Sequence, residues 1–270
     1  MKAIVHFLHT AKETGNSLNL SKSAIFSAYR LSNMKLPEEL TNTVENLLKG
    51  RAKERGTSIQ PEPTIWNVKD LLDYIRTDED SDVQTVIKRT LTLVAITSEK
   101  RVFEIHQMKI NKKKDHGNKL VFQLRITKTK GLDGIFQELK VINYEKEPKI
   151  SPYTNIKKYL ETSKQYREEI LNTKEKNNLW ISSVRPIKAL SDQRISKLIK
   201  QYIAEARITT KTHNTRKAVA SAAAWANMRV QDIVKAIEWK DERMFREVYY
   251  KESEKEILAR TVLQHNNKDE

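Results

Sequence analysis

The sequence predicts a mainly α-helical fold with a small antiparallel β-sheet, an α+β arrangement. Most apolar residues recur at helical spacing, as Ile4, Phe7 and Leu8 do near the N-terminus. One stretch, residues 120–126, instead alternates apolar and more polar residues, which is the period of a strand. The chain has 270 residues, enough for one or two domains with a substantial core.

Residues 1–56 are expected to form a helical domain. A helix is expected over 21–33 and another over 37–50, because proline suits a first helical turn and glycine suits a helix end. The following segment is basic and rich in glycine and proline, with prolines at positions 61 and 63. The domain boundary is therefore predicted after residue 56.

Residues 57–270 are expected to combine helices with the sheet. Asn67 and Asp82 each precede an apolar helical stretch and suit the N-cap position. The strand at 120–126 lies between two sequences typical of turns, and a further strand is expected over 135–144. Helices are expected to follow, over 155–171, 192–206, 213–225 and 230–239.

The charge balance favours a nucleic-acid partner. Lys and Arg number 50 against 35 Asp and Glu, which gives a net charge of +15. A surplus of this size favours a polyanion, although a basic protein with nothing bound is the alternative. The lysines of 112–114 and 128–130 are expected to be solvated charges that also meet DNA phosphates.

Composition excludes several other kinds of chemistry. The chain has no cysteine, so it has no disulfide, no thiolate nucleophile and no cysteine-bound zinc. No apolar run approaches the roughly 20 residues of a membrane-spanning helix. His6 and His9 have a metal-like spacing, but no acidic residue lies close by in the sequence, so a surface or core role is expected. We expect no metal and no cofactor.

The C-terminal third contains an ordered set of polar residues. His213 and Arg216 form an H-x-x-R motif where a helix is expected to start. Trp239 follows Arg216 by 23 residues, and Tyr249 follows Trp239 by 10 residues. Tyr250 competes with Tyr249, because adjacent residues point about 100° apart on a helix and only one of them can face a given group.

Three further residues precede this set. Arg101 and Glu104 stand three residues apart after an apolar helix. Lys128 ends the alternating strand and precedes a glycine-containing turn, with Lys130 as its alternative. Each residue alone is commonplace, whereas the ordered set at workable spacing is hard to obtain by chance.

Together these motifs resemble the tyrosine recombinase, or phage-integrase-like, family, and most closely the recombinases of DIRS-type and related eukaryotic mobile elements. The family has, in order, an Arg followed three residues later by an acid, a Lys in a β-hairpin, H-x-x-R, a His or Trp, and a nucleophilic Tyr. The resemblance covers nearly the whole chain. It implies that residues 1–56 form a helical DNA (core)-binding domain and residues 57–270 the catalytic domain.

The resemblance implies a site-specific recombinase that cleaves and rejoins DNA without metal or ATP. Tyr249 would attack a backbone phosphate and form a 3′-phosphotyrosine intermediate that stores the phosphodiester bond. Arg101 and Arg216 would hold the non-bridging oxygens, because guanidinium forms two-pronged bonds to phosphate. Lys128 would protonate the leaving 5′ oxygen.

The resemblance also assigns roles to the other residues of the set. His213 would assist proton transfer, and the indole N–H of Trp239 would donate to the phosphate. Glu104 would orient His213 or Arg101. A short apolar helix expected around 257–263 would either pack on its own chain or dock on a neighbouring protomer.

The implied partner is double-stranded DNA, bound by a homo-oligomer that ranges from dimer to tetramer, with no membrane. The role would be movement or integration of a mobile element, in the nucleus of a eukaryote or the cytoplasm of a bacterial or phage host. Two alternatives stay open: a type IB topoisomerase-like enzyme, and a catalytically idle DNA-binding protein derived from a recombinase.

Overall fold

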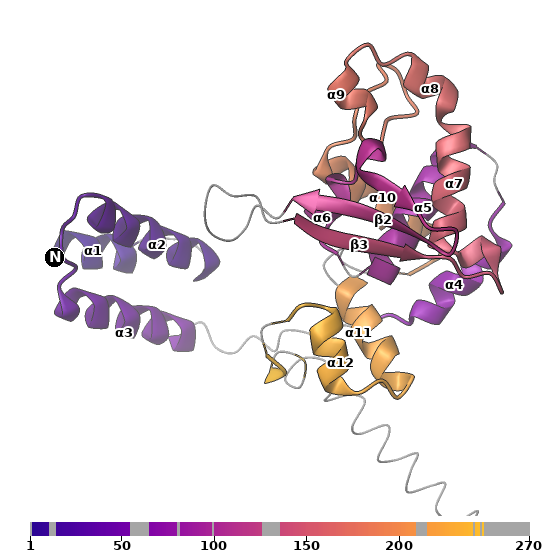
Figure 1. Ribbon diagram of the computed structural model, residues 1–270. Coiled ribbons are helices and arrows are strands. Elements are labelled where there is room, and N and C mark those ends of the chain that lie inside the picture. Colours follow the sequence, from indigo (N-terminus) through magenta and orange to yellow (C-terminus); the bar gives the residue numbers. More distant parts are fainter. Residues whose placement is uncertain are drawn as a thin grey trace, which may run out of the picture. The chain divides into compact units, whose positions relative to one another are not determined.

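A computed structural model describes residues 2–10, 15–54, 65–79, 82–98, 100–125, 136–208, 215–239, 241–243 and 245 (Figure 1). The chain divides into two compact units, Met1–Thr64 and Ile65–Glu270. The boundary predicted after residue 56 falls within 55–64, outside the described residues.

The first unit contains three helices, α1 (Lys2–Thr10), α2 (Gly15–Leu31) and α3 (Glu38–Glu54). Their apolar faces meet in a small core of five buried side chains, Leu8, Leu18, Phe26, Leu40 and Val44. The helical character predicted for this region is confirmed.

The predicted ends of these helices need correction. The second helix starts at Gly15 rather than at residue 21, and α3 continues through Gly50 to Glu54. A glycine inside a helix costs only about 1 kcal/mol relative to alanine, which does not stop a helix that is held by tertiary packing. Arg51 supplies such packing, because its guanidinium donates to the carbonyl of Leu8 at 2.8 Å.

The second unit contains the predicted sheet. Its strands β1 (Lys113–Asp115), β2 (Lys119–Arg125) and β3 (Phe136–Ile142) pair antiparallel in the order β1-β2-β3. The alternation along β2 and β3 directs one set of side chains into the core: Leu120, Phe122, Leu124, Leu139 and Val141. The predicted turn between β1 and β2 contains Gly117 at φ +79°, a conformation that suits glycine.

The remaining helices of this unit, in chain order, are α4 (Val68–Thr77), α5 (Val83–Ser98), α6 (Val102–His106), α7 (Pro152–Thr162), α8 (Lys164–Glu168), α9 (Thr173–Lys176), α10 (Asp192–Glu205), α11 (Thr215–Trp225) and α12 (Val230–Ala236), with short 3-10 turns at Ile110–Lys112 and Pro148–Ile150. Helices α5 and α7 pack on β3 and on each other, and α10 and α11 pack on α5 (Figure 1). None of the helices among the described residues is both long and apolar enough to cross a bilayer.

Local sequence signals explain how several of these helices begin. The side chain of Asn67 accepts from the backbone N–H of Lys69 at 2.9 Å, and Asp82 accepts from that of Thr85 at 2.6 Å. Both predicted N-caps are therefore confirmed. The helix expected over 155–171 is instead two helices, α7 and α8, and Ser151 caps the first.

Candidate active site

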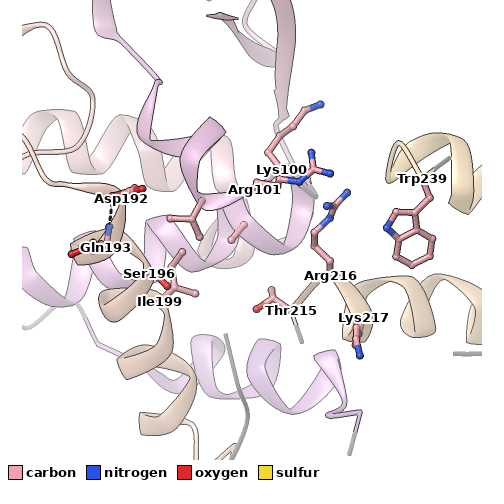
Figure 2. Close-up of a pocket in the computed structure, with 12 residues that line it drawn as sticks. Lys100, Arg101, Asp192, Gln193, Ser196, Ile199, Thr215, Arg216, Lys217 and Trp239 are labelled. Atoms are coloured by element: carbon pink, nitrogen blue, oxygen red, sulfur yellow. Dashed lines mark hydrogen bonds between the residues drawn. The ribbon is translucent and has the colours of Figure 1, made fainter. Parts of the chain in front are cut away.

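Three of the predicted site residues, far apart in the sequence, line one pocket of about 650 Å³. The pocket lies within the second unit, between the segment after α5, the first turns of α10 and α11, and the turn after α12. Figure 2 shows the guanidinium groups of Arg101 and Arg216 pointing into the same part of this pocket, with Trp239 beside them. The other lining residues are Ala95, Lys100, Val102, Asp192, Gln193, Ser196, Ile199, Thr215 and Lys217.

Arg101 is positioned by the start of α6. It is the N-cap residue, with an extended backbone at φ −69° and ψ 151°. The carboxylate of Glu104 accepts a hydrogen bond from the backbone N–H of Arg101 at 2.7 Å, the backward half of a capping box. The two side chains also approach to 3.8 Å, and the Arg101 side chain remains 49% exposed. Glu104 thus fixes the backbone from which Arg101 reaches into the pocket.

Arg216 is positioned differently. It occupies the first turn of α11, it is half-buried, and its guanidinium donates to the backbone carbonyl of Ile237 at the end of α12. Helices α11 and α12 share a second small core, formed by the buried residues Ala220, Ile233, Ile237 and Phe245. The alanine-rich sequence of α11 allows this close packing, because small side chains let helices approach each other.

Trp239 is positioned by the turn that ends α12. The N–H of Glu238 bonds to the carbonyl of Lys235 at 3.2 Å, and the N–H of Trp239 bonds to that of Val234 at 3.0 Å. These two bonds define a Schellman motif, in which one residue with a left-handed backbone conformation ends the helix. The helix therefore stops at Ala236, three residues before the predicted end at 239. The Trp239 ring lies 6.1 Å from the ring of Phe245, centroid to centroid.

Sequence reasoning missed a polar cluster at the edge of the pocket. The ammonium of Lys100 lies 2.5 Å from the carboxylate of Glu238, which also accepts a hydrogen bond from the Gln137 side chain. Burial acts to raise the pKa of Glu238, but the hydrogen bonds from Lys100 and Gln137 and the charges of Lys100 and Arg101 together lower it further, so this pKa lies below its ordinary value. The only signal in the sequence was adjacency, since Lys100 precedes Arg101 and Glu238 precedes Trp239.

The first turn of α10 was also missed as part of the site. Asp192, Gln193 and Ser196 line the pocket. Ser191 caps this helix by accepting from the N–H of Arg194 at 3.2 Å, so the turn is well defined. The pocket wall therefore presents one carboxylate and two neutral polar groups alongside its cations.

Several predicted site residues lie outside the described residues. They are Lys128 with its alternative Lys130, His213, and Tyr249 with its alternative Tyr250. Glu104 was expected to orient His213 or Arg101, and its contacts with Arg101 are the ones observed. Among the described residues, no group of three or more His, Cys, Asp or Glu side chains could hold a metal ion.

The described part of the pocket is suited to an anion. Two guanidinium groups from different helices converge there, and both can form paired hydrogen bonds to a tetrahedral oxyanion. Lys100 and Lys217 add positive charge to the same lining. An indole N–H can donate one further hydrogen bond.

Comparisons with known proteins bear on the fold. No protein-family model and no curated protein matches the chain. Among solved structures, a XerH site-specific recombinase in a post-cleavage complex with difH DNA shares 15% identity, covering 78% of this chain and 56% of that one, with a TM-score of 0.55. A lambda integrase dimer bound to a core site shares 15% identity, covering 92% of this chain and 78% of that one, with a TM-score of 0.51. The chain has the tyrosine recombinase fold.

The tyrosine recombinase fold gives the pocket a context. The mainly helical architecture with a small three-stranded sheet agrees with the fold class predicted from the sequence. The chain spans little more than half the length of the XerH protein that it matches. Identities of this size establish the fold alone.

Proposed function

We propose that this protein is a site-specific DNA recombinase that cleaves and rejoins DNA through a covalent 3′-phosphotyrosine. One observation carries the proposal. Arg101, Arg216 and Trp239, predicted as site residues from their order in the sequence, line one pocket in a chain with the tyrosine recombinase fold. Chance assembly of these three residue types in one pocket is a poor alternative.

The two arginines would hold the scissile phosphate. Attack on a phosphodiester places extra negative charge on the non-bridging oxygens, and fixed donors aimed at this charge stabilise the transition state. Removal of one such donor costs about 2.7–4 kcal/mol in measured cases. Arg101 and Arg216 are far apart in the sequence but line the same pocket, so both guanidinium groups would reach one phosphate there.

The proposed chemistry needs a nucleophile and proton transfers. The Tyr249 oxygen forms a bond to phosphorus while the bond to the 5′ oxygen breaks. The tyrosine proton leaves with the help of His213, and the 5′ oxygen receives a proton from Lys128. Rejoining runs the same steps backwards, so no ATP is consumed. Tyr250 and Lys130 are the alternatives for nucleophile and acid.

The charge of the chain supports double-stranded DNA as the partner. A net charge of +15 favours association with a polyanion, and binding through phosphates weakens steeply with salt. The first unit would act as the core-binding domain and the second unit as the catalytic domain. Strand exchange would use two to four copies on DNA, and the biological role would be movement or integration of a mobile element, in the nucleus of a eukaryotic host or the cytoplasm of a bacterial or phage host.

A covalent trapping assay tests the proposal. Nicked suicide duplexes lose the short strand after cleavage, so the protein–DNA intermediate accumulates and runs slowly on a denaturing gel. The substrate comes from the ends of the parent element or from a random nicked pool. We expect wild type to form this species, Tyr249→Phe to abolish it while retaining DNA binding, and Tyr250→Phe to retain it.

Other outcomes separate the alternatives. Loss of the species only in Tyr250→Phe would assign the nucleophile to Tyr250. Relaxation of supercoiled plasmid by single copies, without paired sites, would identify a type IB topoisomerase-like enzyme. Salt-sensitive binding without a covalent species on any substrate would identify a DNA-binding protein that is catalytically idle. Loss of wild-type activity in chelator would contradict the metal-free mechanism.

A further inference from the structure

The turn after α12 contains an unexpected backbone conformation. Glu238 has φ +56°, in the left-handed region that residues with a Cβ atom disfavour. Among the described residues, the other non-glycine residues with positive φ are Asn33, Arg207 and Asn227. All four end a helix with the same pair of backbone hydrogen bonds. Asparagine tolerates this position well, whereas glutamate has no such tendency.

The side chain of Glu238 gives a reason for a glutamate at this position. Its carboxylate accepts from Lys100 at 2.5 Å and from the side-chain amide of Gln137. The side chain of Lys100 is only 11% exposed, so this ion pair is shielded from solvent on the lysine side. Arg207, at the equivalent position after α10, makes no side-chain hydrogen bond or ion pair within the described part of the chain.

The partners of Glu238 come from separate parts of the unit. Lys100 lies in the segment between α5 and α6, next to Arg101. Gln137 lies on β3 and pairs with Leu124 of β2, the two strands that flank the segment containing Lys128 in the sequence. One carboxylate therefore connects the α5–α6 segment and the sheet to the turn after α12.

The two residues next to Glu238 in the sequence are both connected to the pocket. The carbonyl of Ile237 accepts from the guanidinium of Arg216, and the side chain of Trp239 lines the pocket. Ile237 therefore contacts the lining residue Arg216, Glu238 contacts the lining residue Lys100, and Trp239 lines the pocket itself. A rotation of this turn would move the Arg216 contact and the Trp239 ring together.

We propose that Glu238 is a positioning residue that holds the Arg216 and Trp239 wall of the pocket in register with the Arg101 wall. This inference rests on the proposed function. The carboxylate acts through its neighbours and does not touch DNA. It also reduces repulsion among the cations Lys100, Arg101 and Arg216, which share the pocket lining in the absence of DNA.

The variant Glu238→Gly tests the positioning role of the Glu238 side chain while keeping the left-handed turn that ends α12. Glycine adopts the left-handed conformation without strain, so the variant keeps the turn and loses only the side-chain contacts. Arg207→Gly is the matched control, because it places glycine at the same position of the equivalent turn after α10 and lies outside the pocket lining. We expect the melting temperature of Arg207→Gly to equal or exceed that of wild type, and the relief of left-handed strain to offset part of the cost of the ion pair that Glu238→Gly loses.

The first readout is the single-turnover rate of covalent adduct formation at saturating suicide DNA. We expect Glu238→Gly to lose about tenfold to a hundredfold, since a displacement of about 1 Å can cost about 10²-fold in rate. Arg207→Gly should react like wild type. Glu238→Gln keeps an acceptor oxygen for Lys100 and should fall in between.

The second readout does not depend on activity. Incorporation of 5-fluorotryptophan labels the four tryptophans, and Trp239→Phe identifies the fluorine resonance of Trp239. We expect Glu238→Gly to shift or broaden this resonance and Arg207→Gly to leave it unchanged.

The two readouts distinguish failure of the inference from failure of the proposed function. If wild type forms no covalent adduct, the proposed function is wrong, and the fluorine resonance still decides whether Glu238 positions Trp239. If wild type reacts and Glu238→Gly leaves the Trp239 resonance unmoved, Glu238 is not a positioning residue, whatever its rate. A moved resonance with an unchanged rate would overturn the inference as well.

Discussion

Arg101 and Arg216 line the same pocket, but they are supported by different parts of the protein. Arg101 follows α5, in which all but one of residues 86–96 are buried within the main core. Arg216 opens α11, whose shared core with α12 contains, among the described residues, four buried side chains, Ala220, Ile233, Ile237 and Phe245. Arg101 therefore follows a helix that is buried almost throughout in the main core, whereas Arg216 opens a helix with one buried alanine, Ala218, in that core and another, Ala220, in this smaller cluster.

This difference in packing predicts that the two sides of the pocket differ in how easily they open locally. Elements with few buried apolar contacts open locally at lower free energy than elements of the main core. The Arg101 side is expected to form a fixed reference, and the Arg216 and Trp239 side an adjustable wall. The Lys100–Glu238 ion pair is a side-chain contact between the two sides.

The largest effect is expected from cavities in the two cores. Leu91→Ala, at a fully buried position of α5, should lower the free energy of unfolding by about 2–5 kcal/mol, as large-to-small core changes do. Ile237→Ala should instead mainly speed hydrogen exchange of α11 and α12. Denaturant unfolding combined with amide exchange measures both. Equal global destabilisation, without selective exchange in α11 and α12, would contradict the comparison.

The next effect concerns the adjustable wall directly. Arg216→Ala removes the guanidinium from the pocket and from the Ile237 carbonyl. We expect the rate of covalent adduct formation to fall by about 10²–10³, as for loss of one donor to developing charge. Quantitative suicide-substrate kinetics at saturating DNA measures this. A rate within a factor of a few of wild type would remove Arg216 from the site.

A smaller effect, on stability, is expected when the backbone support of Arg101 is removed on the fixed side of the pocket. Glu104→Ala removes the acceptor for the backbone N–H of Arg101 and should cost about 1 kcal/mol of stability, the usual value for a lost helix cap. Thermal unfolding measures it. Glu104→Gln keeps an acceptor oxygen and serves as the control. If alanine and glutamine destabilise equally, the capping bond contributes nothing and the negative charge is the relevant property.

The smallest effect is expected far from either wall. Arg76 donates to Glu147 through two bonds of 2.9 Å, and these hold the pKa of Glu147 below its ordinary value. Because the folded-state pKa is the lower one, this stabilisation is complete above the unfolded pKa of about 4.3 and is lost as the pH falls through the folded value. The melting temperatures of wild type and Glu147→Gln should converge as the pH is lowered from 6 towards 3. A difference between the two melting temperatures that stays constant over this pH range would contradict the prediction.

The sequence predicted the elements that depend on local pattern. Alternation located β2, and the polar residues Asn67 and Asp82 marked helix starts. Helix ends were predicted less well. Gly50 suggested an end that α3 does not have, while α12 ends at a left-handed glutamate that carries no such signal. In both places tertiary contacts outweigh the intrinsic preference of the residue.

The contacts of the candidate site divide in the same way, into local contacts that the sequence predicts and long-range contacts that it does not. The pairing of Arg101 with Glu104 is a contact between residues three positions apart, which sequence spacing can predict. The contact between Lys100 and Glu238 spans 138 positions and depends on how the α5–α6 segment meets the turn after α12. No local pattern encodes such a meeting. The positions of Lys128, His213 and Tyr249 stay predictions.

The central claim is that Arg101 and Arg216 together neutralise one scissile phosphate. The most direct test replaces that phosphate in the suicide duplex with a methylphosphonate, which lacks the negative charge. If the arginines act by neutralising charge, Arg101→Ala and Arg216→Ala should each form the covalent adduct far faster on the methylphosphonate than on the phosphate, relative to wild type. If neither variant gains on the neutral substrate while wild type cleaves the normal one, the two arginines do not act on the scissile phosphate.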